Sequence, residues 1–250
     1  MWAGHWEVRR FGEIDSTNSY LKAQANEGAP DGLVAVADHQ TAGRGRLDRH
    51  WEAPRGASLL LSVLMRPALD PADLHLCTAA VALAGAEAAR RVCGVSPGLK
   101  WPNDLVIGPA KLAGVLAEAD LGGGSVCWVV VGIGINVAWP GPPEVEGTCL
   151  DDQRSDGAVT DRSELFEGFL GALTPRRTAL ETPDGRRGLA AELRGACDTL
   201  GARVRVDLAG QSISGLATEI DQAGHLIVVT DSGPRTVSAG DVVHLRADQP

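Results

Sequence analysis

The chain has 250 residues, a net charge of −9 and hydrophobic residues at 44% of its positions. This composition excludes a mainly disordered chain, and the acidic surplus disfavours general binding to nucleic acid. Its five cysteines form no CxxC pair, and no apolar run reaches the roughly 18 residues of a membrane span. We therefore expect a reduced, cytoplasmic protein with no membrane partner, built as one large domain or as a main domain with a small one.

The first part of the chain alternates between helix and strand patterns. Helices are predicted at 15–28 and 70–94, and short buried strands at 33–38 and 57–65. The first helix has a polar start, where Ser16, Thr17 or Asn18 can cap it. Asp70 is expected to cap the second helix and Gly94 to end it.

From residue 99 onward strands dominate, and the character of the chain changes again after Cys197. Strands are predicted at 99–107 (broken by Pro102), 111–120 and 126–137, then a long loop at 139–161, and helices at 162–173 and 188–197. Four short runs follow, at 202–208, 212–220, 225–230 and 235–245, with the spacing of a small β-barrel. We therefore divide the chain into residues 1–198 and residues 199–250.

The segment HQTAGRGRLDRHW, residues 39–51, is a cationic, glycine-containing loop between two apolar strands. It does not match the GxxxxGK[ST] pattern of a Walker A loop. Its glycines still let the backbone approach an anion, and Arg44 and Arg46 can pair with phosphate or carboxylate oxygens in a forked geometry. A solvated surface loop explains the segment equally well when it is considered alone.

Two further motifs carry lysine and acidic side chains. In KWPND, residues 100–104, Asp104 could help to hold a divalent cation near phosphates, although a turn with Trp101 in the core is the simpler explanation. In KLAG, Lys111 follows seven residues later on the next strand of a hairpin, where a lysine is more commonly a surface residue.

The run GIGIN, residues 132–136, fails as a dinucleotide fingerprint because Val137 stands where the third glycine is required. Glycines at this place in a strand instead favour close approach of a ligand or of another strand.

In chain order, these motifs resemble those of biotin–protein ligases. STN at 16–18, HQTAGRGR at 39–46, KWPND at 100–104, KLAG at 111–114 and GIGIN at 132–136 have that family's order and approximate spacing. The resemblance extends from about Ser16 to Arg246. It implies an α+β fold, with a mixed β-sheet backed by helices of the class II synthetase-like, biotin-ligase type, followed by a small SH3-like β-barrel.

The resemblance implies a ligase that forms a C–N bond in two steps. Biotin reacts with Mg²⁺-ATP to give biotinyl-5′-AMP and pyrophosphate, and a lysine of a biotin carboxyl carrier protein, the expected partner, then accepts the biotin. Some members of the family carry an N-terminal winged helix and act as repressors. Only fifteen residues precede Ser16, so we expect no DNA binding here. A monomer and a homodimer both fit the sequence.

The resemblance also implies roles for individual residues. Arg46 and Lys111 are the implied catalytic residues. The implied biotin site is Ser16, Thr17, Asn18, Gln40, Gly43, Arg44, Gly45, Arg46, Lys111, Gly114, Gly132 and Gly134. The implied ATP and adenylate site is Arg44, Arg46, Trp51, Asn103, Asp104, Lys111 and Asn136, with Asp104 as the candidate ligand of Mg²⁺.

One position departs from the family pattern. Where the family commonly has glycine after GRGR and one further residue, this chain has Asp48. An added carboxylate and a stiffer backbone predict weaker retention of the adenylate, so Asp48→Gly is expected to slow its escape.

Three other functions are compatible with parts of the pattern. A lipoate or octanoyl transferase would share the core fold, but a plain acyl chain does not need the polar cluster of Ser16, Thr17, Asn18 and Gln40. A biotin-sensing protein without catalysis would not require both Arg46 and Lys111. A generic ATP-binding domain with no acyl acceptor accounts for the least of the sequence.

Overall fold

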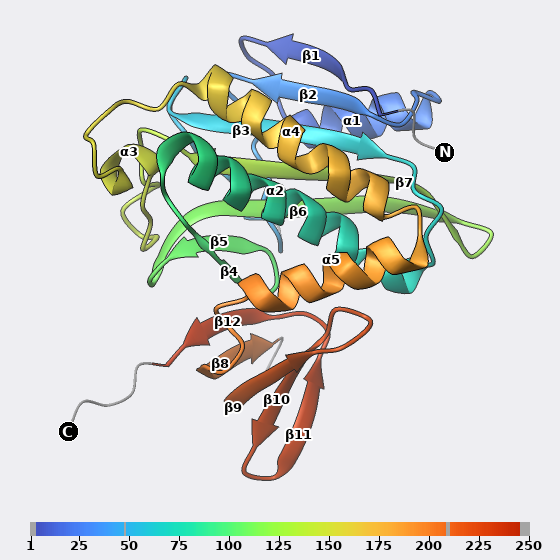
Figure 1. Ribbon diagram of the computed structural model, residues 1–250, viewed down its shortest axis with the longest axis vertical. Helices are drawn as coiled ribbons and strands as arrows, with labels where there is room; N and C mark the ends of the chain where they lie inside the picture. The colour runs from blue at the N-terminus through green and yellow to red at the C-terminus, as the bar shows by residue number, and fades with distance from the viewer. Residues whose placement is uncertain (1–3, 48, 209–210, 246–250) are drawn as a thin grey trace.

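The computed structural model describes residues 4–47, 49–208 and 211–245, and its larger part is built on a seven-stranded mixed sheet (Figure 1). The strands are β1 (Glu7–Phe11), β2 (Leu33–Ala37), β3 (Ser58–Met65), β4 (Gly98–Lys100), β5 (Asp104–Ile107), β6 (Ala110–Gly122) and β7 (Ser125–Asn136). Their order in the sheet is β1-β2-β3-β7-β6-β5-β4. β1 and β2 are parallel, and the other pairs in this sheet are antiparallel.

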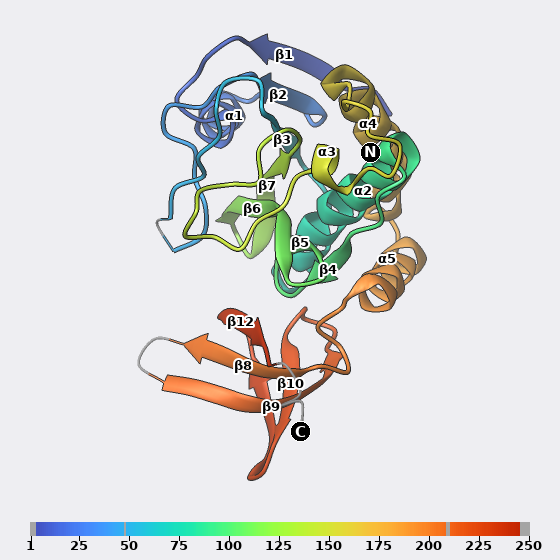
Figure 2. The same cartoon turned by 90° about the vertical axis from the view of Figure 1, so that its left-hand side faces the viewer.

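Helices cover both faces of this sheet. α2 (His75–Cys93), α4 (Arg162–Ala179) and α5 (Pro183–Ala196) lie on one face, and α1 (Thr17–Asn26) lies on the other (Figure 2). All eight residues of β3 are buried, as expected for a strand covered on both sides. Side chains alternate along a strand, so Leu61 and Val63 join the core beneath α2 and α4, whereas Leu64 joins the smaller core beneath α1. The predicted mixed sheet backed by helices is confirmed.

Several predicted boundaries are corrected by local hydrogen bonding. Asp70 does not cap α2; its side chain accepts from Ala72 N at the start of a 3-10 turn, Pro71–Asp73, and α2 begins only at His75. Bonds of the i→i+3 type hold that turn, which is why an α-helical reading fails there. Gly94 ends α2 in the left-handed conformation, as predicted.

Two short elements were not predicted, and two predicted strands are divided. The unpredicted elements are the edge strand β1 and a four-residue helix, α3 (Leu150–Gln153), inside the expected long loop. The predicted strand at 99–107 is a hairpin of β4 and β5, with the turn at 101–103. The last predicted strand, 235–245, is divided in the same way between β11 and β12.

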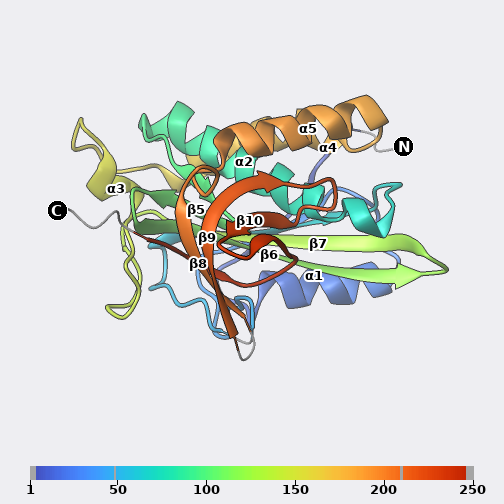
Figure 3. The ribbon, with the colours of Figure 1, turned by 90° about the horizontal axis from the view of Figure 1, so that it is seen from below.

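A separate antiparallel sheet follows α5. It consists of β8 (Arg203–Leu208), β9 (Gln211–Ile220), β10 (Leu226–Thr230), β11 (Gly233–Val237) and β12 (Asp241–His244), in the order β11-β10-β9-β8-β12. Figures 1 and 2 show this sheet at one end of the larger part, and Figure 3 views the molecule from that end. Val204 and Val206 of β8 are fully buried and alternate with exposed charged residues, which is the two-residue period of a strand with one solvated face.

Trp101 joins the two parts. Its side chain belongs to the core of the second sheet, together with Cys197. Its backbone N–H donates to Thr199 Oγ1 at 3.0 Å, and its indole Nε1 donates to the carbonyl of Gly224 at 3.0 Å. All five cysteines are free thiols. Within the described ranges, we find no helix with both the length and the apolar character needed to cross a membrane.

Candidate active site

A cavity of about 320 Å³ opens where the start of α1, the glycine-rich loop at 39–51, and strands β5, β6 and β7 meet. Fifteen of the sequence-predicted residues line it: Ser16, Thr17, Asn18, Gln40, Arg44, Gly45, Arg46, Trp51, Asn103, Asp104, Lys111, Gly114, Gly132, Gly134 and Asn136. These residues come from five separate segments, so the fold alone brings them together. Gly43 does not line this cavity, and its position is described below.

The polar end of the cavity is built at the first turn of α1. Ser16 is the N-cap, in extended conformation, and its hydroxyl accepts from Ser19 N. Thr17 and Asn18 follow and are almost fully buried. Gln40 Oε1 accepts from Thr17 N at 2.7 Å and lies 3.0 Å from Thr17 Oγ1, so the loop after β2 is tied to the helix start.

Ser62 completes this polar end and was missed from the sequence. It stands in the middle of β3 and is fully buried, with its hydroxyl 2.7 Å from Thr17 Oγ1 and donating to Asn18 Oδ1 at 2.6 Å. A single serine within the apolar run of β3 was the available signal, because a buried hydroxyl needs hydrogen-bonding partners.

Three glycines form the floor of the cavity. A Cβ added to Gly132 would lie 2.2 Å from Asn18 Oδ1, and one added to Gly134 would lie 2.5 Å from Trp51 Cε2. Gly114 pairs with Gly134 across the strands, and a Cβ there would lie 3.0 Å from the same indole. The glycines therefore let polar and aromatic side chains approach the sheet backbone. Trp51 Nε1 is buried with no hydrogen-bond partner among the described residues.

Positive charge gathers at the other end. Lys111 Nζ lies 2.8 Å from Asp104 Oδ1, an ion pair without the directional geometry of a hydrogen bond, and 5.7 Å from the centre of the Trp51 ring. Arg46 donates to Asn103 Oδ1 at 2.9 Å. Lys111 Nζ lies 3.3 Å from where a Cβ on Gly114 would stand, and Gly114 pairs with Gly134, two residues along β7 from Gly132, so the cationic group lies across the glycine floor from the polar end.

The glycine-rich loop folds back on itself as a small hairpin. Gly45 N donates to Arg49 O at 2.7 Å, and Trp51 N donates to Gly43 O at 3.0 Å. A Cβ on Gly43 would lie 2.3 Å from the carbonyl oxygen of Trp51, so Gly43 lies behind the cavity and lets the two arms of the hairpin meet. Arg49 forms an ion pair with Asp241 of β12. Asp48 lies outside the described residues.

A second wall of the cavity was also missed from the sequence. Asn136 Nδ2 donates to the carbonyls of Pro140 and Thr148, both at 3.0 Å, which holds the intervening loop against the end of β7. The same loop pairs with the backbone of Lys111 at Glu146 and Thr148. Proline and glycine content had marked this segment only as a loop, because side-chain-to-backbone bonds of this kind leave no periodic pattern.

Asp104 is the side chain predicted from the sequence as a magnesium ligand. Its Oδ1 is buried at the cavity and has no directional hydrogen bond. This oxygen can therefore coordinate a metal ion when Lys111 turns towards a phosphate. In the described part of the chain no three histidine, cysteine or acidic side chains are grouped as metal ligands. The donor set therefore fits an ion that arrives bound to a nucleotide, since Mg²⁺ commonly uses one or two carboxylates plus substrate phosphates.

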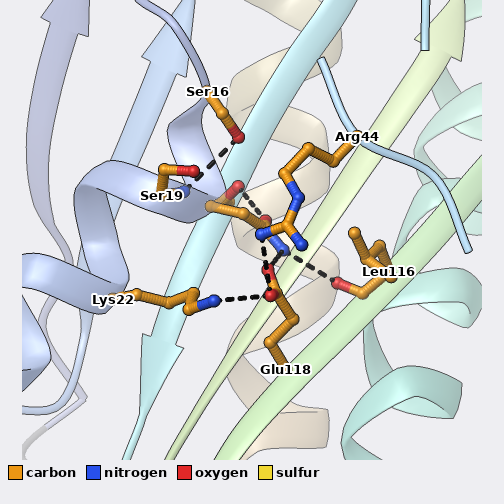
Figure 4. A network of polar contacts seen from close by, with 8 residues as sticks. Ser16, Ser19, Lys22, Arg44, Leu116 and Glu118 are labelled. Atoms are coloured by element: carbon orange, nitrogen blue, oxygen red, sulfur yellow. Dashed lines mark hydrogen bonds and ion pairs between the residues drawn. The ribbon is translucent and has the colours of Figure 1, made fainter. Parts of the chain in front are cut away.

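Glu118 of β6 lies beside the polar end and was not predicted. Figure 4 shows Lys22 and Arg44 converging on its carboxylate. Lys22 Nζ lies 2.6 Å and Arg44 Nη1 2.9 Å from Oε1, and Asn18 Nδ2 donates to Oε2 at 3.0 Å. Burial acts to raise the pKa of Glu118, but hydrogen bonds from Lys22 and Asn18 and the charge of Arg44 outweigh it and hold that pKa below its usual range.

Comparison with known proteins places this geometry in a family. The sequence profile of the biotin/lipoate A/B protein ligase family matches residues 11–136, which contain every motif described above, and that of the biotin protein ligase C-terminal domain matches residues 199–245. The biotin–[acetyl-CoA-carboxylase] ligase of Mycobacterium tuberculosis is 40% identical over 242 residues, covering 94% of this chain and 87% of the relative. The chain belongs to the biotin/lipoate A/B protein ligase family.

Other members of the family extend the likeness to function and fold. The bifunctional ligase/repressor BirA of Escherichia coli is 31% identical over 236 residues, covering 92% of this chain and 71% of that protein. The biotin protein ligase from Aquifex aeolicus, solved in complex with biotin and ATP, superposes with a TM-score of 0.77 at 27% identity, covering 96% of this chain and 99% of that one. The resemblance inferred from the sequence motifs and the predicted fold class are thus confirmed.

Proposed function

We propose that this family member is an ATP-dependent biotin–protein ligase, which forms biotinyl-5′-AMP and then biotinylates a lysine of a biotin carboxyl carrier protein. The observation that carries the proposal is a single cavity with a buried polar end, a glycine floor and a cationic end. Such a cavity suits an acid whose polar head is distant from its carboxylate. The biotin–[acetyl-CoA-carboxylase] ligase from M. tuberculosis supports the same substrate and acceptor for this chain.

The polar end is proposed to bind the ureido ring of biotin. Ser16, Thr17, Asn18 and Gln40 offer hydroxyl and amide groups at fixed positions, and burial makes an unmatched polar group costly. A ring with N–H and C=O groups satisfies such a site, whereas an unsubstituted acyl chain leaves it unpaired. The proposal therefore selects biotin over lipoate or octanoate.

The cationic end is proposed to join two anions. In the first step a carboxylate oxygen of biotin attacks the α-phosphorus of ATP, and the bond from that phosphorus to the pyrophosphate oxygen breaks. Two unit negative charges at about 4 Å repel by roughly 4 kcal/mol at an effective dielectric constant near 20. Arg44, Arg46 and Lys111 line the cavity and offset this repulsion and the charge that grows on the phosphoryl oxygens. When Mg²⁺ is bound with ATP, it neutralises charge on the leaving pyrophosphate, and Asp104 would be its protein ligand.

The second step requires that water be kept from the mixed anhydride. The lysine amine of the carrier attacks the acyl carbon, the C–O bond to AMP breaks, and an amide forms. Trp51 offers a flat aromatic face for the adenine ring, and the glycine-rich hairpin is fastened to the second sheet through Arg49 and Asp241. We propose that this fastening covers the adenylate until the acceptor arrives.

The domain division at residues 1–198 and 199–250 remains our proposal. It is supported by separate apolar cores on either side of it and by a family profile that begins at residue 199. Trp101 and Cys197 contribute to the second core, so the two proposed domains share a packed boundary. We further propose cytoplasmic action as a monomer or homodimer, which the five free thiols support in respect of redox state.

The decisive test is ATP–pyrophosphate exchange with biotin, lipoate or octanoate as the only added acid. Exchange with biotin alone is the expected result, and labelling of a carrier domain with biotin would complete it. Exchange with lipoate or octanoate instead would assign the chain to the other branch of the family. Absence of exchange with every acid would refute the adenylation step.

A further inference from the structure

A chain of buried hydrogen bonds connects Glu118 to the polar end of the cavity. Along this chain, which group donates and which accepts follows from the Glu118 end. Asn18 directs its amide N–H₂ towards two acceptors, the Glu118 carboxylate at 3.0 Å and the Leu116 carbonyl at 3.3 Å. Its amide oxygen must then face the other way, where the Ser62 hydroxyl donates to it at 2.6 Å. An ionised carboxylate can only accept, so it permits only this orientation of the amide.

The direction passes from Ser62 to Thr17. Each hydroxyl has one proton, and that of Ser62 is used on Asn18 Oδ1, so Ser62 does not donate across its 2.7 Å contact with Thr17. The proton of Thr17 has two acceptors within reach, Ser62 Oγ and Gln40 Oε1 at 3.0 Å, since an amide oxygen that accepts from Thr17 N can also accept a second hydrogen bond. Thr17 therefore presents an oxygen lone pair, and no proton, to the cavity.

We propose that Glu118 is a positioning residue of the biotin site, which fixes the amide of Asn18 and thereby sets Thr17 as an acceptor for a ring N–H of the ligand. The inference rests on the proposed function and deepens it, because it explains why a cyclic urea is preferred. With Asn18 reversed, its N–H₂ would donate to Ser62 and Ser62 would donate to Thr17 Oγ1, which would occupy a lone pair that Thr17 otherwise keeps for the ring N–H.

The surroundings of Glu118 support this role. Its side chain is only 17% exposed, and cationic groups from α1 and from the glycine-rich hairpin hold it as an anion. Asn18 Oδ1 lies close against the backbone at Gly132, in space that a Cβ there would fill, since that Cβ would be only 2.2 Å from the oxygen. Glu118 itself does not line the cavity, so it acts through Asn18 and not by touching the ligand.

The test compares wild type with Glu118→Gln, which keeps the shape of the side chain and removes the acceptor-only carboxylate. Calorimetry should show about a tenfold or greater loss of biotin affinity in the variant. Wild type should discriminate against biotin methylated on a ureido nitrogen, and the variant should discriminate less. Glu87→Gln is the matched control, because Glu87 is a similarly buried, arginine-paired carboxylate on α2, outside the cavity; its biotin affinity should stay within about twofold of wild type.

A double-mutant cycle with Asn18→Ala distinguishes positioning from general loosening. If Glu118 acts through Asn18, Glu118→Gln should change biotin affinity by no more than about twofold in the Asn18→Ala background. Wild-type affinity in Glu118→Gln, or an equal loss with and without Asn18, would overturn the proposal. Failure of the wild-type protein to bind biotin would refute the proposed function instead, so the two failures are distinguishable.

Discussion

Replacing Gly132 with alanine tests the geometry of the polar end directly. The added methyl group would lie 2.2 Å from Asn18 Oδ1, far inside a normal contact distance, and 3.0 Å from Ser62 Oγ, which is a tight contact. Asn18 must move, although its amide is held by Glu118 on the other side. The 2.6 Å hydrogen bond from Ser62 to Asn18 is then lost in a buried site.

The size of the effect follows from that hydrogen bond. A buried polar group left without its partner costs about 1–3 kcal/mol. If this cost applies to the arrangement of Asn18 and Ser62 that binds biotin, the affinity for biotin should fall by roughly fivefold to a hundredfold. The fold should survive, because the group displaced is a side-chain end and β7 keeps its backbone pairing with β3 and β6.

Calorimetric titration with biotin and a thermal unfolding curve together measure this prediction. Gly171→Ala is the matched control, since Gly171 is in α4 and no atom lies within 4 Å of an added Cβ. That control should keep biotin affinity and gain about 0.5–1 kcal/mol of stability, as expected for alanine in a helix. A folded Gly132→Ala protein with wild-type biotin affinity would refute the reasoning.

Three further predictions concern rate, stability and pH. Lys111→Ala should lower the rate of adenylation by about 100- to 1,000-fold while the melting temperature changes little, because its ion pair is partly solvated; unaltered pyrophosphate exchange would contradict this. Arg177→Met should cost about 3–5 kcal/mol in urea unfolding, since it leaves Asp31 and Glu181 without their buried cation; a loss below about 1 kcal/mol would be inconsistent with that burial. Burial, with the charge of Lys100, lowers the pKa of His244 below its usual 6.5. The unfolded chain therefore binds more protons than the folded chain at acid pH. The contribution of His244 to stability should be full above pH 6.5 and lost as the pH falls through the lowered pKa. Melting curves between pH 8 and pH 5 should therefore fall less steeply for His244→Gln than for wild type.

The chemistry-bearing motifs were readable in the sequence because each depends on local backbone requirements. Ser16 caps a helix, Gly132 and Gly134 interrupt a β-branched strand, and Arg44 and Arg46 alternate with two glycines. Such features produce spacing patterns that differ from those of ordinary core segments, and their order along the chain carried the family resemblance. The layered fold followed from the same alternation of strand and helix periods.

Element boundaries were less predictable where short-range hydrogen bonds compete. Asp70 and Pro71 have the signature of an α-helix start, yet the chain there closes a 3-10 turn first. The edge strand β1 has charged residues in its middle and little apolar alternation. Its pairing with β2 is a long-range event, which no local pattern encodes.

By itself, the sequence determined most of the longer helices and strands, where the glycines and cations fall, and to which family the chain belongs. Only the tertiary structure showed that Ser62 and Glu118 take part in the polar end, 44 and 100 residues away from Asn18. Neither residue has an unusual neighbourhood in sequence. Their hydrogen bonds exist because strand pairing brings β3, β7 and β6 side by side beneath α1. The carboxylate of Glu118 can only accept hydrogen bonds, and this sets the direction of the bonds.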